Sequence, residues 1–238
     1  MPWKWYNGKV VRKIQESSTT CRFWVETEEK VTFEAGQFVT MDLPIHEKRL
    51  KRWRSYSIAN APHEDLLEFC VVKLEGGLGS TYLTEEIGLG SEIKFKGPSG
   101  TFTLSQELNH DVVMICTGTG VAPFRSMIAD RIHTGGKHKN IHLIFGTRYE
   151  EGILYREELE QWAENDWFTY DVVLSREEKW NGHKGYVHKV YSQAYAEGRQ
   201  EGVHFYLCGW SQMIDEAVVQ LMTKMNVEKE YIHYELYG

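Results

Sequence analysis

The sequence has few cysteines, no long apolar run and no excess of positive charge. Its four cysteines are widely separated, at Cys21, Cys70, Cys116 and Cys208. This spacing fits neither a metal or iron–sulfur site nor a disulfide framework, so we expect no bound metal and a reducing, cytoplasmic environment. The first residues lack the apolar core of a signal peptide, and no stretch approaches the roughly 20 apolar residues of a membrane helix.

The charge balance narrows the range of partners. A net charge of -7 argues against general binding to nucleic acid, although it says nothing about local patches. We therefore expect neither nucleic acid nor a membrane as a partner. With 238 residues, the chain has the length of one large or two small domains, and its apolar content is sufficient for two cores.

The first hundred residues have the pattern of an all-β domain. Short segments rich in Val, Phe, Trp and Thr are separated by polar or glycine-containing turns. Such strands at this spacing favour a closed or nearly closed antiparallel barrel, because closure hides the strand edges. The expected strands are residues 9–17, 21–27, 37–43, 54–59, 66–74 and 92–96, with one helix at 80–87.

Beyond about Ser105 the pattern changes to alternating strands and helices. Short apolar strands alternating with helices predict a doubly wound parallel sheet, so we place a domain boundary between 1–104 and 105–238. The expected strands are residues 112–116, 141–145, 169–174, 204–208 and 231–236. The expected helices are residues 123–134, 155–165, 187–197 and 212–225.

The run Arg54-Ser55-Tyr56-Ser57 combines a guanidinium, an aromatic ring and two hydroxyls in one expected strand. Strand alternation places Arg54 and Tyr56 on one face and the two serines on the other. A forked cation suits a pyrophosphate, and a tyrosine can lie flat against a conjugated ring. Taken alone, the four residues would be better explained as an exposed strand with one salt bridge, and the segments that follow change this balance.

The segment Cys116-Thr-Gly-Thr-Gly-Val-Ala-Pro-Phe124 follows the first parallel strand and begins a helix. Backbone N–H groups converge on an anion at such a place, and Gly118 and Gly120 allow close approach of a phosphate. Pro123 replaces the third glycine of the common dinucleotide motif and suits the first helical turn. The alternative is a glycine turn needed only for packing.

The residues expected near a bound ribose are cationic and not acidic. NAD-binding folds usually have a carboxylate after the second strand, but here that position reads Gly146-Thr147-Arg148. The third strand ends at Ser175-Arg176, and Lys184 and Tyr186 follow shortly. These groups suit a 2′-phosphate, so we expect NADP(H) to bind better than NAD(H). A solvated basic loop is the alternative.

A second possible phosphate site lies in the barrel. Gly76–Ser80 leads into the expected helix, so backbone N–H groups could again hold an anion, close to Arg54. In the second half, Cys208-Gly209 lies at the carboxyl edge of the expected sheet, where ligands of such sheets bind. Two phosphate sites predict two nucleotides.

Together these segments resemble the ferredoxin–NADP reductase family over nearly the whole chain. Arg54–Ser57 resembles the flavin motif of that family, Gly76–Ser80 its FAD pyrophosphate turn, and Thr117–Pro123 its nicotinamide-nucleotide loop. Residues 206–209, 153–158 and 233–237 are also similar, and Ser175–Glu177 with Lys184 and Tyr186 resembles the 2′-phosphate site of the plant-type branch. Residues 97–104 are more similar to flavin and oxygenase reductases.

The resemblance implies an antiparallel Greek-key β-barrel that binds FAD, followed by a doubly wound α/β sheet that binds NADP(H). It also implies that Tyr56 and Tyr237 cover the two faces of the flavin, and that Ser57, Cys208, Glu235 and Tyr237 surround the reacting atoms. The implied cofactor-binding residues are Arg54, Tyr56, Ser57, Gly77, Gly79, Ser80, Thr117, Gly118, Gly120, Pro123, Arg148, Ser175, Arg176, Lys184, Tyr186 and Tyr237.

The activity implied is hydride transfer from NADPH to FAD N5, followed by single-electron transfer to a carrier such as ferredoxin or flavodoxin. The alternatives are a flavin, quinone or oxygenase acceptor, or a flavoprotein module without turnover. The basic run His46–Arg54 could dock an acidic carrier, or it could be a solvated loop with Arg54 alone engaged by FAD.

Overall fold

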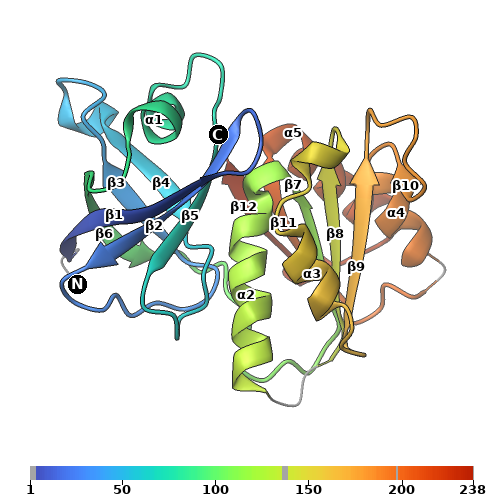
Figure 1. The fold of residues 1–238 in the computed structure, drawn as a ribbon. Coiled ribbons are helices and arrows are strands. Elements are labelled where there is room, and N and C mark those ends of the chain that lie inside the picture. Colours follow the sequence, from blue (N-terminus) through green and yellow to red (C-terminus); the bar gives the residue numbers. More distant parts are fainter. Residues whose placement is uncertain (1–3, 136–138, 197, 238) are drawn as a thin grey trace. The chain divides into compact units, whose positions relative to one another are not determined.

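The computed structural model describes residues 4–135, 139–196 and 198–237, and these form two compact units with one sheet each (Figure 1). One unit contains the described residues up to Leu104 together with Ala122–Gly135, and the other contains Ser105–Val121 and the described residues from 139 onward. Because the contacts of Ala122–Gly135 lie with the first unit, the division into domains 1–104 and 105–238 stays a proposal about which segments fold together.

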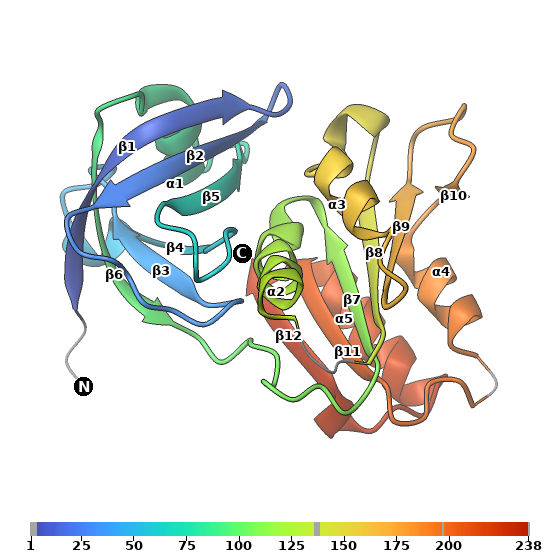
Figure 2. The same ribbon diagram turned by 60° about the horizontal axis from the view of Figure 1, so that its bottom comes forward.

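The first unit is an antiparallel barrel (Figure 2). Its sheet has the order β4-β3-β6-β1-β2-β5. A backbone hydrogen bond from Ala59 N to Glu68 O, 2.9 Å long, links the segment after β4 to β5 and joins the two edges. The strands are β1 (Trp5–Gln15), β2 (Thr20–Thr27), β3 (Phe38–Asp42), β4 (Trp53–Ser57), β5 (Leu67–Val72) and β6 (Glu92–Ser99).

Hydrophobic alternation explains why the barrel closes around one core. In β6, Ile93 and Phe95 are buried while Lys94 between them is exposed, as the period of two requires. Phe23, Phe69 and Phe95 are fully buried in the same cluster. A short helix, α1 (Leu78–Thr81), continues as a π-helical turn, Tyr82–Glu86. A 3-10 turn, Arg49–Lys51, lies between β3 and β4.

The second unit is built on a parallel sheet of order β10-β9-β8-β7-β11-β12. The α4 and α5 helices pack on one face of this sheet in a shared apolar cluster, and α3 lies on the other face (Figure 1). The strands are β7 (Val112–Thr117), β8 (Ile141–Thr147), β9 (Phe168–Leu174), β10 (His183–Lys184), β11 (His204–Trp210) and β12 (Ile232–Tyr237). The helices are α3 (Arg156–Trp162), α4 (Val187–Ala194) and α5 (Ser211–Thr223).

The α2 helix (Val121–Thr134) is bonded to the barrel through buried polar groups. The Arg125 guanidinium donates to Ala59 O at 2.8 Å and lies 3.3 Å from the Glu68 carboxylate, which also accepts from Arg22 at 2.6 Å. Ser126 Oγ donates to the backbone oxygen of Asn60 at 2.6 Å. Buried charges are tolerated only when they are paired in this way, so this network fixes α2 on the barrel.

The predicted fold class is confirmed, and the differences lie at element ends. The helix expected at 80–87 begins at Leu78 and changes to a π-helical turn, and the helix expected at 187–197 ends at Ala194, while Glu197 lies outside the described residues. The two-residue strand β10 was not predicted, because both of its residues are exposed and carry no apolar pattern. No helix among the described residues is long and apolar enough to cross a membrane.

The buried network predicts a large cost when one partner is removed. We expect Arg125→Ala to lower the free energy of unfolding by about 3–5 kcal/mol, because the buried Glu68 carboxylate would lose the Arg125 guanidinium. The exposed pair Lys30–Asp65 provides the matched control, and Lys30→Ala should cost less than about 1 kcal/mol. Urea unfolding of the full chain would measure both, and equal losses would contradict the role given to Arg125.

Candidate functional site

The strand order of the parallel sheet reverses between β7 and β11. A ligand is expected at this point, beside the carboxyl ends of the two strands. Strands β8, β9 and β10 follow outward on one side of β7, while β11 and β12 lie on its other side. In open α/β sheets, ligands bind in the crevice at the carboxyl ends of the two strands that flank such a point. Here those ends are Thr117 of β7 and the Cys208–Trp210 segment of β11.

Two glycines let the loops at this point approach each other closely. A Cβ atom on Gly120 would collide with the backbone oxygen of Cys208, and one on Gly209 would lie 2.5 Å from Thr117 Oγ1. Gly118 has a φ of +53°, which favours glycine. The 3-10 turn Gly118–Gly120 then leads into α2, so backbone N–H groups of a helix start are available at the crevice.

Cys208 lies in the same row of the sheet as Glu235, since their Cα atoms are partners on β11 and β12. Burial raises the pKa of the Cys208 thiol, and the neighbouring Glu235 carboxylate raises it further. Tyr237 forms a side-chain hydrogen bond with this thiol, which acts in the opposite direction. The thiol is therefore neutral near pH 7, and the structure brings three of the four predicted catalytic residues together at one edge.

The residues predicted for the 2′-phosphate lie at the neighbouring strand ends. Ser175 and Arg176 follow β9, and their backbone N–H groups donate to Thr147 O at 3.0 Å and Arg148 O at 2.9 Å, after β8. The Ser175 hydroxyl also donates to Thr147 O at 3.4 Å. Arg148 and Arg176 are exposed. Two guanidiniums are thus held on adjacent strand ends, where an anionic group can reach them.

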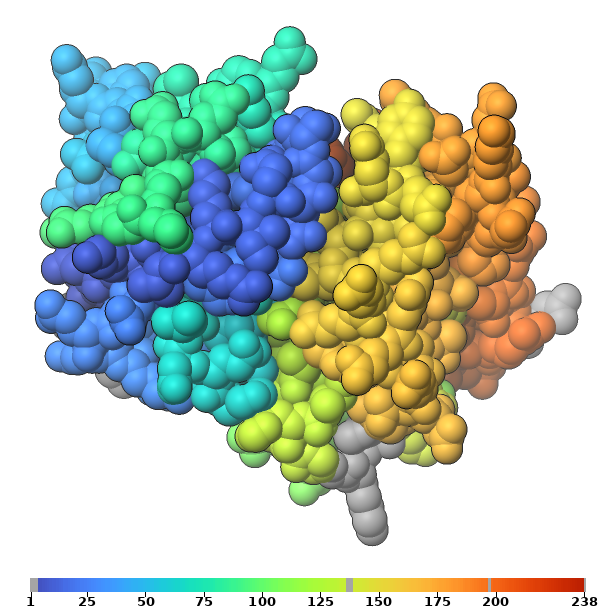
Figure 3. Space-filling model, viewed as in Figure 1, coloured from blue at the N-terminus to red at the C-terminus, as the bar shows by residue number. Residues whose placement is uncertain are grey.

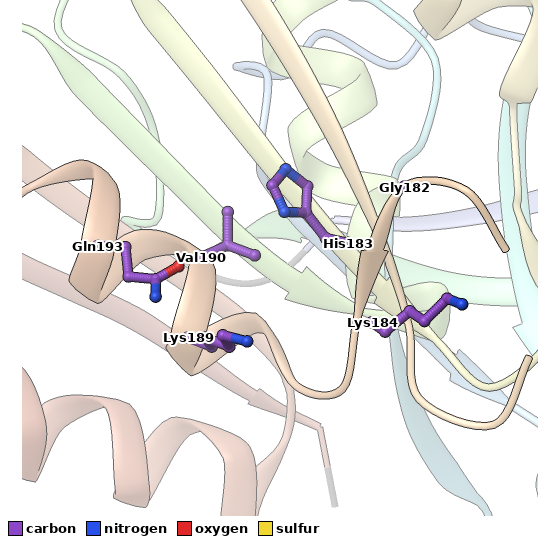
Figure 4. Close-up of a pocket in the computed structure, with 6 residues that line it drawn as sticks. All are labelled: Gly182, His183, Lys184, Lys189, Val190 and Gln193. Atoms are coloured by element: carbon purple, nitrogen blue, oxygen red, sulfur yellow. The ribbon is translucent and has the colours of Figure 1, made fainter. Parts of the chain in front are cut away.

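Strand β10 adds two further predicted residues to this edge. Lys184 pairs with Leu174, the last residue of β9, and Tyr186, with 74% of its surface exposed, precedes α4. A cavity of about 310 Å³ lies between β10 and α4, lined by His183, Lys189 and their neighbours (Figure 4). The Lys184 side chain extends away from α4 and donates to Glu178 O at 2.7 Å.

In the barrel unit, Arg54 and Tyr56 lie on the core-facing side of β4, opposite Met41 and Val39. Arg54 Nη1 donates to the backbone oxygens of Lys51 at 3.1 Å and Trp53 at 2.7 Å, and these bonds fix the guanidinium. Burial raises the pKa of Tyr56 to about 12, although the Arg54 charge acts against this, so the phenol stays neutral.

The α1 turn packs directly on these two side chains. A Cβ on Gly79 would lie 2.8 Å from Arg54 Cγ and 3.4 Å from Tyr56 Oη, so the turn has no space for a side chain. Ser80 Oγ accepts from Leu74 N and donates to Gly77 O, both at 3.0 Å, and thereby closes the turn. A cavity of about 250 Å³ borders Gly76, Gly77 and Leu78.

Ser57 and Pro123 are the remaining predicted residues of the site. Ser57 is the last residue of β4, is 5% exposed and pairs with Phe38. Pro123 lies in the first turn of α2, as expected. Gly209 was predicted to lie with Cys208 at the ligand-binding edge but was given no contact of its own. Its φ of +134° and its close approach to Thr117 make it part of the crevice. Within the described parts of the chain, no cluster of His, Cys, Asp or Glu could hold a metal.

The residues present fit two nucleotides. In the barrel, a fixed guanidinium, a neutral phenol and a glycine turn meet in one place, which suits a pyrophosphate attached to a flat ring system. In the sheet, a glycine loop at a helix start borders a cluster of cations. These features define the class of a two-nucleotide oxidoreductase that uses a flavin and a pyridine nucleotide.

Comparison with known proteins gives the same two cofactors. A model of the oxidoreductase FAD-binding domain matches residues 7–104, and a model of the oxidoreductase NAD-binding domain matches residues 114–219. The chain is 34% identical to ferredoxin–NADP reductase B of Sorangium cellulosum, covering 86% of this chain and 85% of the relative. It is 31% identical to the phenol hydroxylase P5 protein of Acinetobacter pittii, covering 97% of this chain and 65% of the relative.

Solved structures share the fold. A cytochrome P450 reductase from Amycolatopsis superposes with a TM-score of 0.88 at 25% identity, covering 99% of this chain and 70% of that one. A ferredoxin–NADP+ reductase from Neisseria gonorrhoeae gives a TM-score of 0.82 at 23% identity, covering 98% of both chains. The chain belongs to the ferredoxin–NADP reductase family, and it is a flavin-dependent NAD(P)H oxidoreductase that transfers electrons.

The close approach at Gly120 predicts a specific loss of nucleotide binding. We expect Gly120→Ala to raise the dissociation constant for NADPH at least about 10-fold, because the added methyl group displaces the loop from Cys208. Gly88→Ala is the matched control, since a Cβ there meets nothing within 4 Å. Titration of the flavin absorbance with nucleotide would measure both constants, and unchanged binding in Gly120→Ala would contradict this reading of the loop.

Proposed function

We propose that the chain oxidises NADPH and passes electrons singly to an acidic carrier protein such as a ferredoxin or a flavodoxin. The observation that carries this proposal is the carboxyl edge of the sheet, where a glycine crevice and a cluster of cations occupy adjacent strand ends. The 34% identity to a ferredoxin–NADP reductase supports a carrier of this kind.

Arg54, Tyr56 and the turn at Gly77, Gly79 and Ser80 would hold FAD in the barrel. The guanidinium neutralises the pyrophosphate, the turn supplies N–H donors, and the phenol ring gives a flat surface against the ring system. When bound, FAD accepts a hydride and releases electrons one at a time, which is the chemistry of the cofactor. Ser57, buried at the end of β4, would present its hydroxyl to a ring nitrogen or carbonyl.

The crevice between β7 and β11 would hold the pyridine nucleotide. The backbone of Thr117, Gly118 and Gly120 binds the pyrophosphate, and the start of α2 at Pro123 adds its favourable dipole end. Tyr237 lies on the Cys208 thiol through a hydrogen bond, so a nicotinamide ring that enters this edge displaces it. This exchange weakens unproductive binding of the nicotinamide ring and helps the nucleotide to leave.

Cys208 and Glu235 would orient the nicotinamide ring at this edge. A buried neutral thiol excludes water without adding charge, and the Glu235 carboxylate beside it can hold the carboxamide or stabilise positive charge on the ring. The protein thus sets the distance and orientation of the nicotinamide ring and excludes water from it.

The cation cluster supports NADPH as the physiological donor. Arg148, Ser175 and Arg176 are held together by backbone bonds, Lys184 and Tyr186 follow on β10 and beyond, and the second strand ends without a carboxylate. A 2′-phosphate would find two forked cations there, whereas the free 2′-hydroxyl of NADH would lack the acidic partner that it usually has.

An oxygenase component is the second candidate acceptor. The chain is 31% identical to the phenol hydroxylase P5 protein and 30% identical to a phenol 2-monooxygenase reductase component from Pseudomonas, and it spans 65% of the length of each. Those names support a role as the reductase of an oxygenase system. The two candidates share the flavin chemistry and differ in the protein that receives the electrons.

The cofactor preference predicts a selective effect of one arginine. We expect Arg176→Ala to raise the KM for NADPH about 10-fold and to leave the KM for NADH nearly unchanged, because one charge-assisted contact to the 2′-phosphate is lost. Lys179→Ala removes another exposed cation of the same loop and should change neither value. Steady-state rates with both nucleotides test this, and equal losses with the two would remove Arg176 from the 2′-phosphate site.

The acceptor is identified by comparing several under identical conditions. The purified protein should show flavin absorbance that NADPH bleaches faster than NADH does. With NADPH in excess, we expect turnover with ferredoxin or flavodoxin to exceed turnover with free flavin. A colourless protein that takes up no FAD would refute the flavin assignment, and a preference for free flavin would refute the carrier assignment.

A further inference from the structure

Four polar side chains are connected across the outer strands of the parallel sheet. Asp171 of β9 lies between two histidines, with Oδ2 2.9 Å from His142 Nε2 on β8 and Oδ1 3.4 Å from His183 Nε2 on β10. His142 Nδ1 in turn lies 2.9 Å from the hydroxyl of Tyr195, which directly follows α4. These four residues are called the histidine–aspartate cluster below, and they link three neighbouring strands to the end of a helix.

The surroundings of this cluster favour an ionised carboxylate at its centre. The hydrogen bond from His142 lowers the pKa of Asp171, and His183 acts in the same direction, while partial burial opposes them. Burial raises the pKa of Tyr195, so its hydroxyl stays protonated and can donate to His142 Nδ1. A neutral His142 then keeps its Nε2–H for one carboxylate oxygen, and the other oxygen is left for His183.

Strand β10 has little backbone pairing, and His183 adds a side-chain contact to it. The strand consists of two residues at the edge of the sheet, where His183 pairs with Val173 and Lys184 with Leu174 of β9. One further backbone bond runs from Gly185 N to Leu174 O at 3.0 Å. The loop before β10 stands out at the surface, in orange at the upper right of Figure 3. Because so little backbone holds this strand, the contact with the carboxylate on β9 contributes to fixing its place.

The two residues of β10 face opposite ways, as strand alternation requires (Figure 4). The imidazole of His183 lies on the side of α4, where it meets Asp171. The Lys184 side chain extends away from α4 and donates to Glu178 O. The histidine is therefore directed away from its neighbouring lysine, and its influence on a phosphate at the sheet edge would be exerted through the position of that lysine.

We propose that His183, through its contact with Asp171, fixes β10 and thereby places Lys184 for the 2′-phosphate of NADPH. His183 is then a positioning residue, and the inference rests on the proposed function. The register supports it, because Lys184 pairs with Leu174, two residues before Arg176 in the chain. The side chain of His183 is 50% exposed and that of Asp171 30% exposed, and ion pairs in such surroundings contribute modestly, so we expect an effect of a few fold.

The test compares His183→Ala with Lys184→Ala in the full chain, with menadione, a small uncharged quinone, as electron acceptor. We expect Lys184→Ala to raise the KM for NADPH about 10-fold and His183→Ala to raise it about 3- to 5-fold. In both variants kcat and the KM for NADH should stay within about 2-fold of the wild type. The double variant should resemble Lys184→Ala, because His183 acts through that side chain, whereas independent effects would multiply to about 30- to 50-fold.

Two further variants separate positioning from general structural damage. His183→Lys keeps a cation beside the carboxylate on β9 and should return the KM for NADPH to within about 2-fold of the wild type. His188→Ala is the matched control, since it removes another histidine–carboxylate contact, to Glu216 at 3.8 Å, which links α4 to α5 and does not involve β10. This control should leave the KM for each nucleotide within about 2-fold of the wild type.

The same measurements distinguish failure of this inference from failure of the proposed function. If the wild type oxidises neither nucleotide with menadione, the proposed function fails and the inference fails with it. If Lys184→Ala leaves the KM for NADPH unchanged, the place given to Lys184 in the 2′-phosphate site is refuted, again together with the inference. If Lys184→Ala raises that KM, the inference alone is overturned by an unchanged KM in His183→Ala, by an equal rise with NADH, or by a multiplied loss in the double variant. It is also overturned if His183→Lys gives no recovery or if His188→Ala causes the same rise as His183→Ala.

Discussion

The close approach of two loops at the carboxyl edge of the parallel sheet is the constraint on which the nucleotide site depends. Gly120 lies against the backbone of Cys208, and Gly209 lies against Thr117, so neither position has space for a Cβ atom. The floor of the crevice is therefore backbone, and its N–H groups can face an anion without interference from side chains. Because β12 pairs with β11 in register, the same edge also presents Glu235.

In the barrel unit, the buried ion network has a corresponding role. Glu68 is 1% exposed and is shared by Arg22 and Arg125, while Ser126 bonds to Asn60. The helix that carries Arg125 begins directly after the glycine loop, and its partners Ala59 and Asn60 follow the flavin motif by two and three residues. Packed apolar surfaces can slide, but buried charges and hydrogen bonds accept one register only, so the network fixes this helix against the strand that ends at Ser57.

The sequence predicted both sheets and indicated the loops of the candidate site, because strand alternation and glycine loops are local signals. The strands of the barrel and the order of strands and helices in the second unit follow directly from the apolar pattern. The pairing of Arg125 with Glu68 could not be predicted, since a charged residue inside an apolar segment does not reveal its partner. The cluster of Trp5, Trp53 and Lys96 was missed for the same reason: these residues meet only once three strands take their register.

Register also explains how one short strand can serve two purposes. In β4, Arg54 and Tyr56 face the α1 turn, while Trp53 lies on the other side with the cations of β6. A shift of one residue would exchange the two sets of side chains, moving the guanidinium away from the turn and the tryptophan into the core. The apolar partners Val39 and Met41, both fully buried, oppose such a shift. Burial of two side chains on β3 thereby fixes both the flavin motif and the outer face of the barrel.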